Sequence, residues 1–194
     1  MGKVSNWELA KGRSTDRIEQ LNLVGLKSQL VAFIIFSLEQ KEGSKARPPM
    51  PDEKLLCQLH HAATVFLLKR PGRYRQSKVH LQSNGVVAFR PPHWNEIQRL
   101  MREFFGELAV VWREGDALDV AAFALWRITW IHPFRDGNGR TAFAFAYACL
   151  CLKLGALLPH TDTVLDQMLA HLSQCNGPLR AADESIMAMR KPNL

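Results

Sequence analysis

Apolar positions recur at intervals of three and four residues along most of this 194-residue chain, which is the pattern of amphipathic helices. The clearest run spans residues 97–111, and comparable runs span residues 18–38 and 55–66. Residues 79–89 differ, because apolar and polar residues alternate there around Ser83-Asn84-Gly85, a sequence typical of a hairpin turn. The pattern therefore predicts an all-α protein with one small β-hairpin.

A polar, proline-containing stretch from Lys41 to Pro51 interrupts the helical pattern. The helix before it is predicted to begin at Ser14-Thr15-Asp16, because these residue types favour helix N-termini. Asp52 and Asp116 are each predicted to begin a further helix, and a last helix is predicted after Thr161. We therefore expect an N-terminal helical segment over residues 1–45 and a main domain over residues 46–194.

Two apolar stretches raise the question of a membrane span. Residues 30–38 are too few to cross a bilayer, which needs about 20 apolar residues. Residues 141–158 approach that length, but they include Lys153 and Gly155 and follow a polar, glycine-rich loop. A buried central helix that is apolar on every side accounts for this segment, so no membrane contact is expected.

The amino-acid composition restricts the expected cellular location of the protein and the classes of partner that it binds. The four cysteines have no zinc-type spacing, and the first residues lack the apolar core of a secretory signal, so we expect a cytoplasmic protein. The net charge of +7 is spread along the chain, and its one dense basic cluster, residues 69–78, contains a single aromatic residue. Because base-stacking surfaces need several aromatic residues, nucleic acid is not an expected partner.

The candidate catalytic and ligand-binding residues lie within residues 131–140. His132 has the side chain best suited to act as a general base near neutral pH. Asp136 offers oxygen ligands of the kind that Mg²⁺ prefers, and Arg140 offers a planar fork for a phosphate. The turn between them opens a helix N-terminus, where backbone N–H groups bind anions. This turn consists of Gly137, Asn138 and Gly139. Together these residues indicate phosphate chemistry.

The same stretch, IHPFRDGNGR, resembles the signature HxFx(D/E)GNGRxxR of the Fic (Fic/Doc) family. The predicted hairpin upstream and the segment PGRYR at residues 71–75 are also similar to that family, so the resemblance covers roughly residues 50–175. It implies a Fic-type helical domain with a hairpin flap before the active-site loop. It also implies a protein adenylyltransferase, which attaches AMP from ATP to a serine, threonine or tyrosine hydroxyl of a target protein.

The resemblance implies a role for each matched position. His132 would deprotonate the target hydroxyl, Asp136 would hold Mg²⁺ against the α- and β-phosphates, and Arg140 would bind the β-phosphate. The turn of Gly137, Asn138 and Gly139 would cradle the same phosphates.

The flap would hold the target protein as an added, extended strand, a mode of binding that reads little sequence. In the family, the first strand of the flap presses on the target side chain. The corresponding residues here are Val79 and Leu81.

One position departs from the signature, because Phe143 stands where the family has its second arginine. That arginine contacts the γ-phosphate of the donor, and losing a charge-assisted contact of this kind costs about 1.5–3 kcal/mol. Three interpretations stay open: recognition of ATP without its γ-phosphate, use of another donor that leads to UMP or phosphocholine transfer, and a weakened site. A nucleotide- or peptide-binding module without catalysis is the alternative from another class.

The segment from Thr15 to Glu19 is similar to the family's inhibitory helix motif, (S/T)xxxE(G/N), although Gln20 replaces the last residue. The resemblance implies that Glu19 restrains activity, and Thr15 belongs to the same motif. In the family this glutamate pairs with the arginine that Phe143 replaces. Thr15 and Glu19 are also consistent with an ordinary helix start, because an early acidic residue is favourable to the helix dipole.

Overall fold

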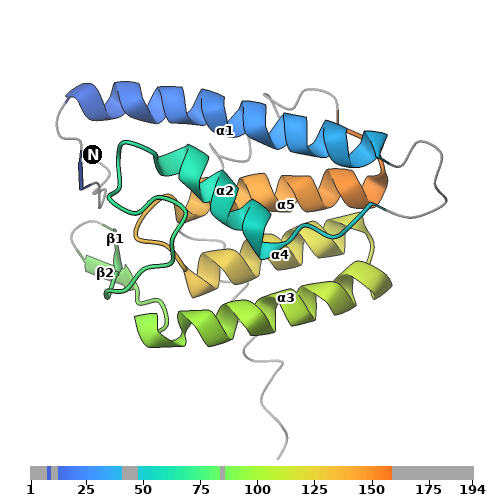
Figure 1. Ribbon diagram of the computed structural model, residues 1–194. Helices are drawn as coiled ribbons and strands as arrows, with labels where there is room; N and C mark the ends of the chain where they lie inside the picture. Colours follow the sequence, from blue (N-terminus) through green and yellow to red (C-terminus); the bar gives the residue numbers. More distant parts are fainter. Residues whose placement is uncertain (1–7, 10–12, 41–47, 84–85, 159–194) are drawn as a thin grey trace, which may run out of the picture.

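The computed structural model (Figure 1) describes residues 8–9, 13–40, 48–83 and 86–158. Within these residues the fold is mostly helical, and a short 3₁₀ helix over Trp94–Glu96 precedes the third α-helix. The α-helices are α1 (Arg13–Glu39), α2 (Glu53–Thr64), α3 (Ile97–Glu114), α4 (Ala117–Ile131) and α5 (Asn138–Leu154). The helix predicted after Thr161 lies outside the described residues.

Helix α5 occupies the middle of the bundle, with α1 and α2 on one side and α4 and then α3 on the other (Figure 1). Every residue from Thr141 to Cys149 is buried, and the small alanines at alternate positions let neighbouring helices approach closely. Phe145 and Tyr147 fill the space between these alanines and are fully buried. The prediction of a central helix that is apolar on every side is confirmed.

Two predicted helix starts are also confirmed by their capping contacts. The Asp52 carboxylate accepts a hydrogen bond from the Leu55 backbone N–H at 2.9 Å. Asp116 accepts from the N–H groups of Leu118 and Asp119, and the Asp119 side chain accepts in return from the Asp116 N–H. These contacts satisfy donors that a helix N-terminus leaves unpaired.

Strands β1 (Leu81–Ser83) and β2 (Val86–Phe89) pair antiparallel, with an irregular register next to Leu81. Val79 precedes β1, and the predicted turn residues Asn84 and Gly85 lie outside the described residues. In Figure 1 this pair of strands lies beside the loop that joins α4 to α5.

Helix α1 has the bounds that the sequence pattern predicted to within a residue or two, but much of its surface is exposed. Its buried stripe is narrow and consists of Asn22, Leu26, Leu30, Ile34 and Ser37. The stretch from Thr15 to Glu39 is long and apolar enough to cross a membrane by length and composition alone, and 28% of its most apolar window is buried. Residues 30–38 alone are too few to span a bilayer, as expected, and it is the whole helix that contains them that reaches the required length. Core helices of soluble proteins pass the same test.

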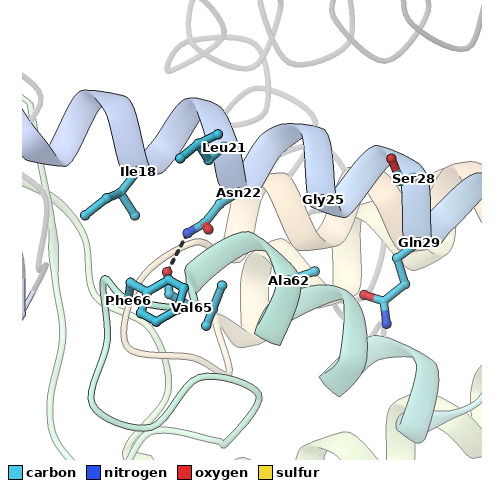
Figure 2. A pocket seen from close by; sticks show the side chains of 9 residues that line it. All are labelled: Ile18, Leu21, Asn22, Gly25, Ser28, Gln29, Ala62, Val65 and Phe66. Atoms are coloured by element: carbon cyan, nitrogen blue, oxygen red, sulfur yellow. Dashed lines mark hydrogen bonds between the residues drawn. The ribbon is translucent and has the colours of Figure 1, made fainter.

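An open groove of about 720 Å³ separates α1 from the end of α2 (Figure 2). Asn22 crosses it and donates a hydrogen bond to the Val65 carbonyl at 2.7 Å. Phe66, which the helical pattern placed on the buried face of α2, is 71% exposed. Helix α2 ends at Thr64, and Phe66 takes a left-handed conformation with φ 63° that turns its ring away from the core.

Candidate active site

His132 ends helix α4 in a left-handed conformation, with φ 51° and ψ 58°. Its backbone N–H closes the helix by donating to the Ile128 carbonyl at 2.9 Å. A non-glycine residue in this conformation is uncommon, and such strained residues cluster at functional sites. The turn at His132 ends α4 abruptly and directs the chain into the loop.

The environment of His132 keeps its imidazole neutral. Burial lowers the pKa of His132 to about 4, and the nearby positive charge of Arg75 acts in the same direction. The Thr129 backbone and the Asp136 carboxylate oppose this shift but do not cancel it. At neutral pH the side chain is therefore uncharged and able to accept a proton.

The shape of the loop depends on Asn138, the first residue of α5. Its side-chain oxygen accepts from the Phe134 N–H at 2.8 Å, and its amide nitrogen donates to the Phe134 carbonyl at 3.0 Å. The Asn138 side chain is 2% exposed and Phe134 is fully buried, so this pair of bonds anchors the loop in the core. Any contact of Asn138 with an anion is therefore made by its backbone N–H.

Gly137 sits where the loop presses against α2. Its φ is 74°, and a Cβ atom built there would lie 2.6 Å from Cγ2 of Thr64, so a side chain does not fit. The Gly137 N–H donates to the Asp136 carboxylate at 2.6 Å, and the Thr141 hydroxyl donates to the Gly137 carbonyl at 2.9 Å. Glycine at this position meets both a conformational and a steric requirement.

The N-terminus of α5 is suited to bind an anion. The N–H groups of its first turn, at Asn138, Gly139 and Arg140, have no acceptor within the helix, and the helix dipole adds positive potential there. Burial lowers the pKa of Arg140. Glu19 of α1 and the Asp136 carboxylate both attract its guanidinium and oppose this shift without cancelling it. Positive charge and backbone donors thus converge beside His132 and Asp136.

Asp136 fits the role of a Mg²⁺ ligand that shares the ion with phosphates. In the described part of the chain no three His, Cys, Asp or Glu side chains gather as a metal cage. Mg²⁺ in phosphate-transfer sites is bound by one or two carboxylates, water and the phosphates themselves. A single carboxylate at an anion-binding helix N-terminus matches that donor set.

Arg75 is a site residue whose role the sequence did not reveal, although it ends the PGRYR segment. It is 5% exposed, and its side chain donates to the carbonyls of His132 at 2.8 Å, Pro92 at 2.6 Å and Ser77 at 3.2 Å. Its backbone N–H also donates to the Pro133 carbonyl at 2.9 Å. Arg75 therefore ties the segment that leads into β1 to the backbone that carries His132.

The structure places the remaining predicted residues as follows. Phe143 is 5% exposed and packs in the bundle, so a core side chain occupies the position of the family's second arginine. Glu19 lies close enough to Arg140 to influence its ionisation, and Thr15 is one helical turn before Glu19 on α1. Leu81 begins β1, Val79 lies two residues before it, and both side chains are half-buried.

The model of the Fic/DOC family matches residues 51–150. This match covers just over half of the chain and includes α2, the hairpin and the loop, so the chain belongs to the Fic/DOC family. Members of this family transfer nucleotide or other groups to proteins.

Solved structures of Fic proteins have similar folds. A Fic family protein from Desulfovibrio desulfuricans G20 is 18% identical with a TM-score of 0.51, over 94% of this chain and 69% of that chain. A Fic domain containing signaling protein from Bacteroides thetaiotaomicron VPI-5482 is 20% identical with a TM-score of 0.55, over 86% of this chain and 60% of that chain. BepC, a VirB-translocated Bartonella effector protein from Bartonella tribocorum with bound AMPPNP, is 14% identical with a TM-score of 0.50, over 84% of this chain and 94% of that chain.

Proposed function

We propose that this protein is an adenylyltransferase that moves AMP from ATP to a serine, threonine or tyrosine hydroxyl of a target protein. The observation that carries the proposal is the convergence of a neutral, half-buried His132 with the anion-binding N-terminus of α5 and the Asp136 carboxylate. The bound AMPPNP of the similar BepC protein supports a nucleotide as the donor, because AMPPNP is an analogue of ATP.

In the proposed reaction the target oxygen attacks the α-phosphorus, the bond to the β-phosphate oxygen breaks, and pyrophosphate leaves. His132 accepts the hydroxyl proton. The first-turn N–H groups of α5 and the Arg140 guanidinium orient the α- and β-phosphates. Asp136 would hold Mg²⁺, which neutralises phosphate charge when it is bound.

The burial of Phe143 favours a second class of donor, one that is recognised without a γ-phosphate. Phe143 is buried in the bundle and has no charge, so it offers nothing to a γ-phosphate. CDP-choline has no γ-phosphate and would lose nothing at this position, whereas UTP has the same triphosphate as ATP and would use the loop as well as ATP does. Transfer of UMP or phosphocholine is therefore the alternative within the enzymes, and a nucleotide- or peptide-binding module is the alternative outside them.

We also propose that the target enters as an extended strand beside β1, with Val79 and Leu81 against its side chain. Arg75 supports this arrangement, because it bonds to the His132 carbonyl and also to Ser77 and Pro92 on either side of the strands. A target held by the strands would thus be held in register with the base.

Glu19 would restrain this reaction through Arg140. The motif position that receives the family's inhibitory glutamate is Phe143 here, but the attraction of Glu19 for Arg140 supplies another partner. A carboxylate beside Arg140 competes with donor phosphate for the guanidinium. Thr15, one turn earlier, belongs to the same restraining segment.

The first experiment is incubation with cell lysate, Mg²⁺ and a panel of donors labelled in the transferred phosphate. The expected result is covalent protein labelling by ATP that is lost in His132→Ala. A preference for UTP or CDP-choline would support the alternative donor, and nucleotide binding without labelling by any donor would support the binding module.

Glu19→Gln tests the restraint, and Glu39→Gln, at the other end of α1, is its matched control. Labelling by Glu19→Gln is expected to rise roughly tenfold or more, because the variant no longer attracts the Arg140 guanidinium that the donor phosphate needs. Labelling by the control is expected to equal that of the wild type. Equal labelling by all three proteins would show that Glu19 exerts no restraint.

A further inference from the structure

His60, on helix α2, is a fully buried polar residue that the sequence pattern left without a role. Its ring stacks on that of Phe134 in the active-site loop, with centroids 3.8 Å apart and planes 7° from parallel. The two ring nitrogens contact different loops. Nδ1 faces the Gly72 N–H at 2.8 Å, and Nε2 faces the Asp136 carbonyl at 2.9 Å.

These two partners define the protonation of the ring. The Gly72 N–H can only donate, so Nδ1 must carry a lone pair. The Asp136 carbonyl can only accept, so Nε2 must carry the proton. His60 is therefore the neutral Nε2–H tautomer.

The bond to Asp136 determines which way the Asp136–Gly137 peptide faces. In a trans peptide the C=O and the following N–H point in opposite directions. With the carbonyl held on α2, the Gly137 N–H faces the Asp136 carboxylate, to which it donates at 2.6 Å. A flipped peptide would present a carbonyl oxygen to that carboxylate and to any bound phosphate, and glycine at 137 imposes little steric barrier to such a flip.

We infer that His60 is a positioning residue for the transfer reaction: it holds the Asp136–Gly137 peptide in the orientation that phosphate binding requires and links it to the Gly72 segment before the flap. The inference rests on the proposed function and adds a residue to its machinery. Gly72 reinforces the link, because a Cβ there would lie 2.9 Å from the Cys57 carbonyl, so its segment is seated directly on α2.

Three substitutions of His60 separate positioning from packing. Glutamine places an amide N–H near the position of Nε2, and asparagine places a polar atom near Nδ1 only. Phenylalanine keeps the stack on Phe134 but has neither polar atom. Positioning therefore predicts that His60→Gln retains labelling efficiency to within about tenfold, whereas His60→Asn and His60→Phe lose roughly a hundredfold. A packing role predicts that His60→Phe is the most active of the three, and that result would overturn the inference.

His61 provides the matched control, because it is the next residue on α2 and is exposed. His61→Gln and His61→Asn are expected to label like the wild type, with unchanged donor KM. For His60→Asn and His60→Phe, the donor KM is expected to rise and kcat to fall. The melting temperatures of the Gln and Asn variants are expected to be close to each other, so a difference in labelling between them does not reflect stability. Equal losses in the Gln and Asn variants would count against the role of Nε2.

A spectroscopic measurement on the wild type decides the matter even if the variants fold poorly. In protein labelled with ¹⁵N-histidine, the long-range ¹H–¹⁵N spectrum at neutral pH is expected to show His60 as the neutral Nε2–H tautomer. A charged ring or the Nδ1–H tautomer would overturn the inference. If the wild type labels nothing with any donor, the proposed transfer fails. The structural part of the inference, that His60 orients the Asp136–Gly137 peptide, then survives only if this tautomer is present and the Gly137 amide resonance moves in His60→Asn but not in His61→Asn.

Discussion

Helices α1 and α5 both contain long apolar stretches, yet they have different surroundings. Nine consecutive residues of α5, from Thr141 to Cys149, are buried on every side. Helix α1 buries a narrow stripe against α2 and α5 and exposes large apolar side chains on its outer face, including Val24 and Phe36. Although both helices contain long apolar stretches, α5 is a core helix and α1 covers the core from one side.

In the proposed function this difference separates the residues of transfer from the residue of restraint. The N-terminus of α5 is the candidate anion site, and its position is maintained by the whole bundle. The candidate restraint, Glu19, is carried by α1, which has fewer buried contacts to hold it. Elements with few buried apolar contacts open at lower free energy than the core does. A chain arranged in this way can release α1 while its catalytic loop stays formed.

The largest expected effect comes from breaking the core around α5. Phe145 is fully buried, with its ring 6.3 Å from that of Phe104 and 6.1 Å from that of Phe105. Phe145→Ala is expected to lower the free energy of unfolding by about 3–5 kcal/mol, because it removes the ring and leaves a cavity. Urea denaturation followed by circular dichroism measures this loss, and labelling activity is expected to fall with it. A loss below 1 kcal/mol would contradict the central position of α5.

A substitution in the buried stripe of α1 is expected to have an intermediate effect on the free energy of unfolding. Leu30 is fully buried, and Leu30→Ala is expected to lower the free energy of unfolding by about 2 kcal/mol, near the lower limit for this type of substitution. Its effect on labelling should be opposite to that of Phe145→Ala, because a loosened α1 withdraws Glu19 from Arg140. Amide hydrogen exchange should show faster exchange in α1 than in α5. Reduced labelling would mean that α1 supports the site rather than restraining it.

Much of this arrangement was predictable from local sequence. The alanine-rich pattern of residues 141–158 predicted a buried helix, and aspartates 52 and 116 predicted helix starts that their caps confirm. The signature loop was recognisable because all its chemical groups lie within nine residues. Each of these features depends on neighbours in the chain, which periodicity and residue type report directly.

The features that local sequence did not predict join residues far apart in the chain. Arg75 binds the carbonyl of a residue 57 positions away, and His60 binds the carbonyl of one 76 positions away. A periodic pattern indicates that a position is buried but not which backbone group it meets. The partner of Glu19 was missed for a related reason, because the motif directed attention to position 143 and the fold brings Arg140 to Glu19 instead.

The smallest expected effect is on the outer face of α1, and it tests whether that face is as open as its exposure indicates. Phe36 is 61% exposed, so Phe36→Ala removes a ring that makes few buried contacts. The free energy of unfolding is expected to change by less than about 0.5 kcal/mol, as for other exposed positions. Phe145→Ala is expected to lower the free energy of unfolding several times more than Phe36→Ala. The two variants therefore compare α5 and α1 by the same change of residue. A loss at Phe36 as large as that at Phe145 would show that another surface covers α1 in solution, and α1 would then be a core element like α5.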